Sequence, residues 1–321
     1  MSFKQATDAP MKHCFCMLLG VLLVGTLAAR PFSPGNVSAK AKWFIHADLQ
    51  AFKKSSLGKF VLGQTDRLGK QIQSVEEMLK LDIRRDLHGV TLYGVGKEET
   101  EAVVVLHGRF DRERITALAS TAKEHRVVRL REHKIHSWED KKGTHYGCLL
   151  KDNTLVFSDG LQTLREAVNV LEQKSTGLET KAIVRRATAG DHPFFLLGLV
   201  DFKALGTLDA NAKILEKLNS LCFAVGQAGD DLQGRLLVQP RDKESGGQIM
   251  HIFKGMVAFA QIEPGENDPE QRKFKELAKR LKIEMAEPFI SMNLKIPVRD
   301  IVEAMKLKMK TNPAKATADR D

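Results

Sequence analysis

The sequence contains little cysteine and few large aromatic side chains. Its 321 residues include 4 Cys, 2 Trp and 2 Tyr. So few cysteines exclude a small fold held together by a dense disulfide framework. The 24 Gly and 10 Pro are ordinary numbers, which excludes a collagen-like repeat. Hydrophobic residues make up 43% of the chain, enough to bury a core, so intrinsic disorder is excluded as well.

Long apolar runs are also scarce, and the one that stands out lies near the N-terminus. Residues 14–29 carry no charge, and Lys12 precedes them. A basic start, a short apolar run and small residues after it are typical of a secretory signal. We expect cleavage after Ala28 or Ala29, or after Ala39. A periplasmic or secreted location follows from this interpretation.

The alternative is a protein that stays tethered to a membrane by this uncleaved N-terminal segment. A spanning helix needs about 20 apolar residues, and the run is shorter than that. We therefore assign residues 1–39 to a signal peptide and a short linker. No second apolar run approaches this length, so we expect no transmembrane segment in the mature chain.

Cleavage would leave two cysteines, Cys148 and Cys222. We interpret both as small buried residues in strands, which is the common environment of a free cysteine. The alternative is a disulfide between them, because an exported protein meets an oxidising compartment.

Two segments far apart in the chain share a pattern. Residues 47–51 read Ala-Asp-Leu-Gln-Ala and residues 200–204 read Val-Asp-Phe-Lys-Ala, each after an apolar, strand-like run. A helical pattern, a hairpin pattern and a second helical pattern follow each copy. The sequence thus predicts a duplicated α/β unit. The alternative is two unrelated domains that share a periodicity by chance.

The predicted units cover residues 40–180 and 190–308, followed by a flexible tail at 309–321. The polar stretch 174–191 joins them. In the first unit we expect a helix at 112–123 and then a meander of strands.

In the second unit we expect helices at 247–261 and 270–285. The strands come in hairpins and not in strict βαβ alternation, which predicts an α+β fold. We expect two tandem similar units, each a largely antiparallel sheet with helices packed on one face.

Motifs of nucleotide-binding and hydrolytic enzymes are lacking. The run 94–100 (Gly-Val-Gly-Lys-Glu-Glu-Thr) has one residue between its glycines and Glu98 after the lysine, so it predicts a hairpin turn and not a phosphate loop. No G-x-S-x-G elbow is present. Cys148 lies near His145 in sequence, but this pair alone does not define a nucleophile and its base.

Histidines are concentrated in one region, and five of the ten lie between residues 107 and 145. A zinc site needs three or four converging ligands, and neither an HExxH motif nor a CxxC pair occurs. His136, His145 and Glu139 could converge if a turn interrupts the strand between His133 and His136. We interpret these histidines as strand and turn residues, and we assign no catalytic, cofactor-binding or metal-binding residue.

The net charge of +10 is spread evenly along the chain. Residues 40–180 contain 24 basic and 20 acidic residues, and residues 181–321 contain 23 and 19, so each half carries +4. The densest basic run is 126–131, which we expect to place Arg129 and Arg131 on one strand face. A diffuse charge without interleaved aromatic residues argues against nucleic-acid binding and leaves a weak attraction to an anionic envelope component.

The order of these features loosely resembles a group of uncharacterised exported bacterial proteins, which carry a signal peptide and then a twice-repeated α/β unit. The matching residues are the Ala-Asp-Leu-Gln-Ala and Val-Asp-Phe-Lys-Ala segments at 47–51 and 200–204. These motifs are structural, so the resemblance implies a fold and a location but no site residue.

We therefore predict an exported, non-catalytic binding or structural protein of the periplasm or cell envelope. Its partner would be an envelope protein or an anionic envelope component, with the ligand surface between the two units, and no cofactor is expected. The alternatives are an extracytoplasmic hydrolase with an unrecognised site and a histidine-dependent metal-binding protein.

Overall fold

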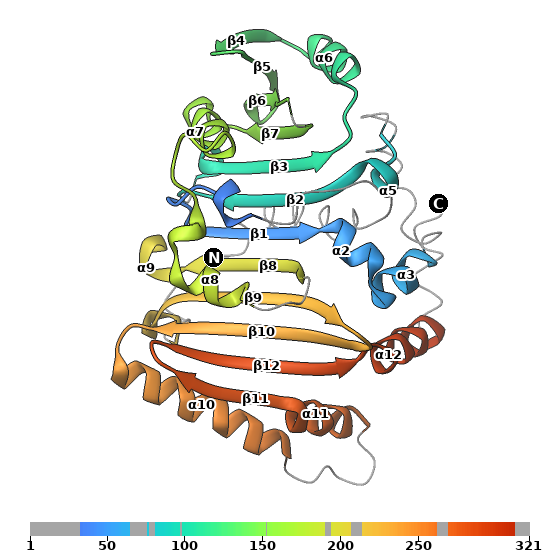
Figure 1. The fold of residues 1–321 in the computed structure, drawn as a ribbon, viewed down its shortest axis with the longest axis vertical. Helices are drawn as coiled ribbons and strands as arrows, with labels where there is room; N and C mark the ends of the chain where they lie inside the picture. The colour runs from blue at the N-terminus through green and yellow to red at the C-terminus, as the bar shows by residue number, and fades with distance from the viewer. Residues whose placement is uncertain are drawn as a thin grey trace, which may run out of the picture.

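The computed structural model describes residues 33–64, 76, 81–96, 98–151, 153–189, 194–206, 214–261 and 269–311. These residues form a single sheet of twelve strands in the order β11-β12-β10-β9-β8-β1-β2-β3-β7-β6-β5-β4 (Figure 1). Neighbouring strands are antiparallel throughout the sheet. The α+β class predicted from the hairpins is confirmed, but the two expected sheets are joined into one.

The elements of the first half follow the predicted order. They are η1 (Pro34–Asn36), β1 (Trp43–Asp48), α2 (Leu49–Lys54), α3 (Ser56–Leu62), α5 (Ile83–Asp86), β2 (Leu87–Gly94), η3 (Glu99–Glu101), β3 (Ala102–Gly108), α6 (Arg112–Ser120), β4 (Arg126–Leu130), β5 (His133–Asp140), β6 (Gly143–Leu149), β7 (Thr154–Ser158) and α7 (Leu161–Leu171). The predicted meander is confirmed as β4 to β7.

The second half has longer strands and a longer central helix. Its elements, with the join before them, are η4 (Leu178–Thr180), α8 (Ala182–Ala187), β8 (Phe194–Asp201), α9 (Phe202–Leu205), η5 (Leu215–Lys217), β9 (Leu218–Ala228), β10 (Asp231–Pro240), α10 (Lys243–Gln261), α11 (Pro269–Arg280), β11 (Leu281–Ala286), β12 (Phe289–Pro297) and α12 (Val298–Thr311). Of the described helices, none is long and apolar enough to cross a membrane.

The halves meet in the middle of the sheet, where β1 pairs with β8. Trp43 lies opposite Val200 and Ala47 lies opposite Leu196. Outward from β1 the sheet continues as β2, β3, β7 and β6, and outward from β8 it continues as β9, β10, β12 and β11. Each half therefore adds two hairpins in the same spatial order. The hairpins β2–β3 and β9–β10 lie next to the centre, and the hairpins β6–β7 and β11–β12 lie outside them.

The two Asp residues of the sequence pattern are helix caps. The amide of Ala51 donates to Asp48 Oδ1 at 2.8 Å at the start of α2, and the amide of Ala204 donates to Asp201 Oδ1 at 2.9 Å at the start of α9. An aspartate at this position satisfies an amide that has no partner inside the helix. The shared pattern thus marks the point where a strand turns into a helix.

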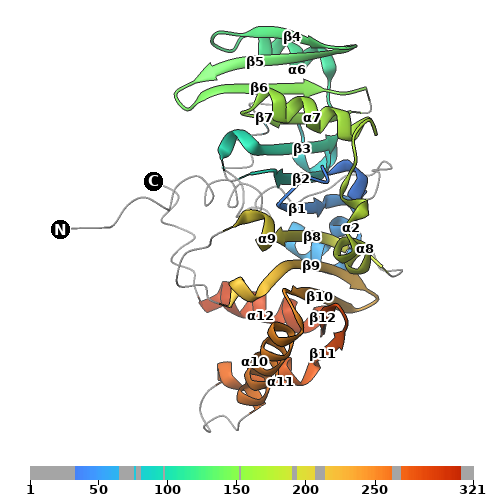
Figure 2. The same ribbon diagram turned by 90° about the vertical axis from the view of Figure 1, so that its left-hand side faces the viewer.

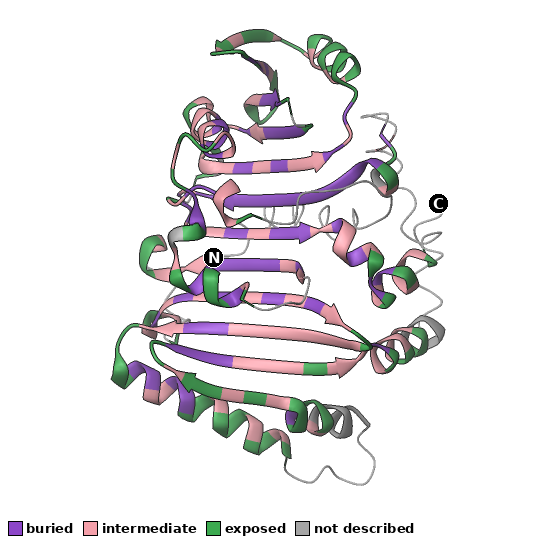
Figure 3. Cartoon of the chain, viewed as in Figure 1, coloured by how far each residue is buried: buried purple, intermediate pink, exposed green. Residues whose placement is uncertain are grey.

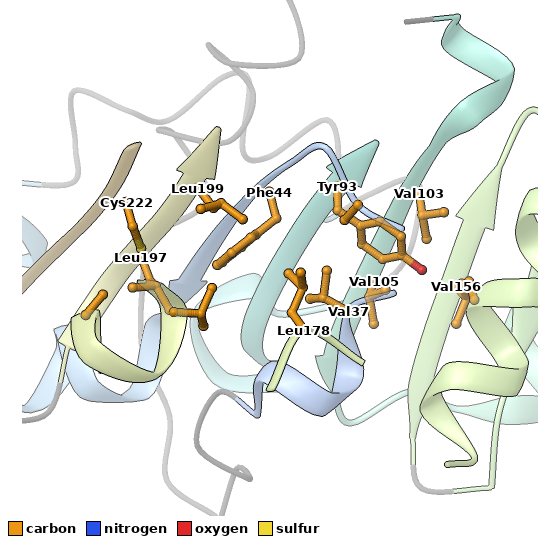
Figure 4. Close-up of a cluster of buried hydrophobic side chains, with 14 of the residues drawn as sticks. Val37, Phe44, Tyr93, Val103, Val105, Val156, Leu178, Leu197, Leu199 and Cys222 are labelled. Carbon is orange, nitrogen blue, oxygen red and sulfur yellow. The ribbon is translucent and has the colours of Figure 1, made fainter. Parts of the chain in front are cut away.

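One face of the sheet, here the first face, is covered by η1, α7, η4 and α8. Its buried side chains include Phe44 and Tyr93 from the central strands, with Val37 and Leu178 lying over them (Figure 4). Alternate residues of each strand point to this face, as the twofold repeat of a strand requires.

The opposite face, the second face, carries α6 and α10. Val238 and Ile290 pack there against Ile249 and Met250 of α10. Figure 2 shows α8 and α10 on opposite sides of the sheet. Helices therefore lie on both faces, because the inner strands of so large a sheet bury apolar residues in both directions.

The join between the halves is folded, although its composition is polar. It contains η4 and α8, with Ile183, Val184 and Ala187 buried against the first face. The Lys181 ammonium lies 2.7 Å from Asp201 Oδ2 and ties this segment to the end of β8. The mean hydropathy of this stretch is low because charged residues dominate it, so the composition does not reveal the few apolar residues that are buried in the core.

The predicted helix 270–285 is wrong at its C-terminal end. Helix α11 stops at Arg280, and the next six residues form β11, paired with β12. Leu281, Ile283 and Met285 fit a strand repeat, while Leu281 and Met285 also fit a helical turn, so local periodicity is ambiguous. The tertiary pairing with β12 decides between them.

Other predicted helix boundaries shift by a few residues. Helix α6 ends at Ser120 instead of 123, and α10 begins at Lys243 instead of 247. Helix α3 is capped by Ser55, whose hydroxyl oxygen accepts from the amide of Gly58 at 2.9 Å. The rest of the helical pattern after the first copy, residues 65–80, lies outside the described residues except at 76.

The segment assigned to a linker before residue 40 is part of the core. Val37 and Ser38 are buried, and the Val37 carbonyl accepts from the amide of Leu178 at 2.9 Å. This segment lies beside the central strands, of which β2 is buried along its whole length (Figure 3). The amide of Ala39 donates to the carbonyl of Thr176 at 3.0 Å. Residues 33–39 therefore belong to the folded unit and not to a linker.

Cys148 and Cys222 are free and buried, as we expected. They lie in β6 and β9, with β7, β3, β2, β1 and β8 between them. Six inter-strand steps of about 4.8 Å separate them by roughly 29 Å, whereas a disulfide needs Cα atoms within about 7 Å. A disulfide between the two within one chain is therefore excluded.

Candidate functional site

A cavity of about 170 Å³ lies where the first turns of α7 meet the end of β2 and the segment after η1. We call it the Tyr93 cavity. Its lining residues are Ser38, Lys40, Tyr93, Val95, Gln162, Thr163 and Glu166. It lies in the first half of the chain and not between the two units, where we expected the ligand surface.

Helix α7 reaches the cavity because its start is held tightly against the turn before β3. The Thr163 hydroxyl donates to the carbonyl of Thr100 at 2.8 Å. A Cβ on Gly160 would clash with the same carbonyl, so glycine is required at this helix start. The Ser158 hydroxyl donates to the carbonyl of Ala102 at 2.7 Å and fixes the preceding strand end.

The floor of the cavity is Tyr93, which is only 1% exposed. Figure 4 shows its ring packed in the first-face core with the hydroxyl pointing away from Phe44. Burial, and then the nearby Glu166 carboxylate, raise the pKa of Tyr93 above its ordinary value. The phenol is therefore neutral and can donate a hydrogen bond. A buried tyrosine hydroxyl usually finds a polar partner.

The rim of the cavity carries opposite charges. Lys40 Nζ lies 3.4 Å from Glu166 Oε1, and the lysine side chain is largely exposed. Exposed ion pairs of this kind contribute about 0–1 kcal/mol, so either group can exchange its partner for a ligand at little cost. The cavity thus combines a neutral hydroxyl, a cation and a carboxylate.

His145 is held between two carboxylates. Its Nδ1 lies 2.6 Å from Asp159 Oδ1 and its Nε2 lies 2.9 Å from Asp140 Oδ1. Burial lowers the pKa of His145, but the hydrogen bonds to Asp140 and Asp159 outweigh it and raise that pKa overall. Nδ1 is engaged by Asp159, and His145 lies on the second face whereas Cys148 lies in the first-face core, so this histidine is not placed to act as a base on Cys148.

His136, His145 and Glu139 do not converge. His136 and His145 lie on the second face, but Glu139 alternates to the first face along β5. His136 instead stacks on His125, whose Nε2 lies 3.0 Å from His136 Nδ1. Burial, followed by the charges of His125 and Lys134, lowers the pKa of His136.

Glu132, His133 and Glu172 are close enough together to hold a metal ion. Glu172 is already engaged, because it lies 2.6 Å from His133 Nε2 and 2.7 Å from Lys174 Nζ. Lys174, and then His133, lower the pKa of Glu172 to about 2. With Arg131 at 3.3 Å as well, a cation would have to displace existing positive charges. We interpret the group as an ion-pair network.

His46 and His107 lie in the first-face core beside threonines. His46 Nδ1 is 2.7 Å from Thr91 Oγ1, and His107 Nδ1 is 3.2 Å from Thr154 Oγ1. Burial, and then the charge of His107, lower the pKa of His46 to about 3. His46 is therefore a neutral, buried core residue.

Two further sequence predictions have clear outcomes. Burial raises the pKa of the Cys148 thiol to about 11, so this thiol is protonated at neutral pH. Arg131, predicted to share a strand face with Arg129, lies beyond the end of β4 with φ 54° and bonds to Asn169 on α7. The basic run is thus divided between a strand and a turn.

None of the residues of the Tyr93 cavity was singled out by the sequence. Tyr93 reads as one apolar residue of a strand, and Glu166 reads as a charged residue of an amphipathic helix. Their proximity depends on the packing of α7 across β2 and β3, which no local pattern records.

Comparisons with known proteins give distant likenesses in structure alone. No family model matches the chain, and no curated protein matches it. The solved structure of crystal form III of TP0453 is similar over 87% of this chain and 98% of that chain, with 7% identity and a TM-score of 0.45. The solved structure of crystal form IV of TP0453 is similar over 86% of this chain and 96% of that chain, with 7% identity and a TM-score of 0.46.

Proposed function

We propose that this protein is an exported, non-catalytic binding protein of the periplasm or cell envelope, and that the Tyr93 cavity is its ligand site. The uncharged run at residues 14–29 supports export. The cavity carries the binding proposal, because it presents Tyr93, Lys40 and Glu166 around one small space without an activated nucleophile.

The polar groups define the ligand chemistry. Glu166 accepts hydrogen bonds, Lys40 donates them, and the Tyr93 hydroxyl can do either. A volume of about 170 Å³ is below the roughly 300 Å³ of a typical small-molecule pocket, so the ligand is small or is one end of a larger molecule. We propose a molecule with hydroxyl or amino groups, such as a sugar unit of an envelope polysaccharide.

The two enzymatic or metal-dependent alternatives have less support. His145 lies between the carboxylates of Asp140 and Asp159, and Glu172 is paired with neighbouring cations. Each of these groups would first have to lose its present partner, whereas the Tyr93 hydroxyl has no hydrogen bond to another of the described residues that a ligand would have to break.

The binding proposal is tested by titrating the purified chain with glucosamine and recording NMR chemical shifts or heat. We expect saturable binding that is at least tenfold weaker in Tyr93→Phe, which removes only the hydroxyl, and in Glu166→Gln. Tyr146→Phe is the matched control, because Tyr146 does not line the cavity and should bind as the wild type does. Unchanged binding in Tyr93→Phe would show that the cavity is not the ligand site.

The duplication also remains a proposal, and the sheet supports it. Ile45 and Gly198 each lie three residues before the capping aspartate of their half, and they face one another across the β1–β8 pair. A twofold axis through this pair would relate the two halves. We infer that residues 40–180 and 190–308 are copies of one unit, with β4 and β5 as additions to the first copy.

A further inference from the structure

One edge of the sheet is formed by β11 (Figures 1 and 2). Among the described residues this strand pairs with β12 on one side and with no strand on the other. A free edge presents backbone N–H and C=O groups that can pair with a further strand. Proteins protect such edges with charged residues or proline, and six-residue β11 contains one lysine, one glutamate and no proline.

An apolar stripe on α10 adjoins this edge. Ile252, Met256 and Phe259, spaced four and three residues apart, are 41%, 59% and 75% exposed. The N-terminal part of α10 packs beside β11, where a Cβ on Gly246 would lie 3.8 Å from the methyl group of Met285. Met285 is itself exposed, so the edge strand and the stripe together present apolar surface on the second face.

We propose that β11 pairs with β11 of a second copy of this chain, in antiparallel orientation and centred on Ile283. In this register Lys282 of each copy lies opposite Glu284 of the other. Leu281 lies opposite Met285, and Ile283 lies opposite itself. Opposite charges directly across a strand pair stabilise it, so the sequence of the edge is complementary to itself.

Competing registers are less favourable. A register centred on Lys282 places two lysines opposite each other, and one centred on Glu284 places two glutamates opposite each other. A register centred between two residues would join the apolar second face of one copy to the polar first face of the other. Centring on Ile283 avoids both faults.

The twofold axis of this pairing runs perpendicular to the sheet, so both α10 helices lie on the same face of the continuous sheet. The exposed stripe of each copy then flanks the new strand pair and can be covered on association. The other edge, β4, carries Arg126 and Arg129 without an acidic residue, and pairing two copies there would gather four arginines. Self-association is therefore favoured at β11.

Charge reversal on the exposed edge tests the register. The purified chain is expected to dimerise in sedimentation velocity over micromolar concentrations. Lys282→Glu and Glu284→Lys each create two like-charged pairs and should raise the dimer dissociation constant about tenfold or more, or about 1.4 kcal/mol. The double variant Lys282→Glu with Glu284→Lys restores both pairs and should dimerise as the wild type does.

Mixing the two single variants provides the sharpest result. A Lys282→Glu chain and a Glu284→Lys chain complement each other fully, so the mixture should form a heterodimer although each variant alone stays monomeric. Phe259→Ser should weaken the dimer through the stripe, and Arg129→Glu on β4 is the control that leaves it unchanged. A wild type that stays monomeric, single variants that still dimerise, or dissociation by Arg129→Glu would each overturn the proposal.

Discussion

The segment before residue 40 offers a direct test of where the folded protein begins. Val37 is 0% exposed and packs under η4 in the first-face core. The substitution Val37→Ala removes two buried methyl groups at about 0.8 kcal/mol each, and the cavity left behind adds to the loss. We expect Val37→Ala to lower the free energy of unfolding by about 2–3 kcal/mol.

The assay is urea denaturation followed by circular dichroism. Val127→Ala is the matched control, because Val127 is 48% exposed on the edge strand β4 and the same change should cost less than about 0.5 kcal/mol. If Val37→Ala is as stable as this control, then the segment 33–39 does not belong to the core.

The same reasoning selects among the cleavage positions. Cleavage after Ala39 would remove Val37 and its hydrogen bond to Leu178 from the folded chain. If the chain is exported and cleaved as we propose, N-terminal sequencing of the mature protein should therefore find a start at residue 29 or 30. A stable mature protein that begins at Lys40 would refute this expectation.

Three further predictions follow from caps, ion pairs and buried thiols. Asp48→Ala and Asp201→Ala should each lower the free energy of unfolding by about 1 kcal/mol in urea titrations, because a helix amide loses its cap; an unchanged midpoint would contradict the capping role. The pKa of Glu172 is lowered from 4.5 to about 2, so its contribution to stability is present above pH 4.5 and is lost as the pH falls towards 2. Glu172→Gln should flatten this acid limb in unfolding midpoints measured against pH, and an equally steep limb would count against the ion-pair network. Cys148 and Cys222, with pKa values raised to about 11 and about 12, should resist iodoacetamide at pH 8 in native protein and react fully in denaturant, as mass spectrometry would show; fast native labelling would contradict their burial.

Local patterns predicted most of the elements because their causes are local. Asp48 and Asp201 each start a helix by accepting a hydrogen bond from the amide three residues later in the chain. The alternation of apolar and polar residues in 133–158 specifies strands, because successive side chains of a strand point to opposite faces. The prediction of a helix over 270–285 was wrong after Arg280, where the local pattern fits a helix and a strand equally well. Its last residues fit both repeats, and pairing with β12 made them a strand.

The candidate site could not be predicted in this way. Tyr93 and Glu166 are 73 positions apart in the sequence, and they meet because α7 packs across the first face. Glu139 is the converse case. It is only three residues from His136 in sequence, but its side chain lies on the opposite face of the sheet.

The sequence by itself determined the α+β class, the two capped strand-to-helix turns, the absence of a disulfide framework and the even charge of the two halves. These properties depend on composition or on neighbours along the chain. Only the tertiary structure decided that the two halves share one twelve-stranded sheet, that residues 33–39 and the join belong to the core, and that a hydroxyl, a cation and a carboxylate surround one cavity. These depend on contacts between residues far apart in sequence, whose free energy is gained only when distant apolar surfaces are buried together.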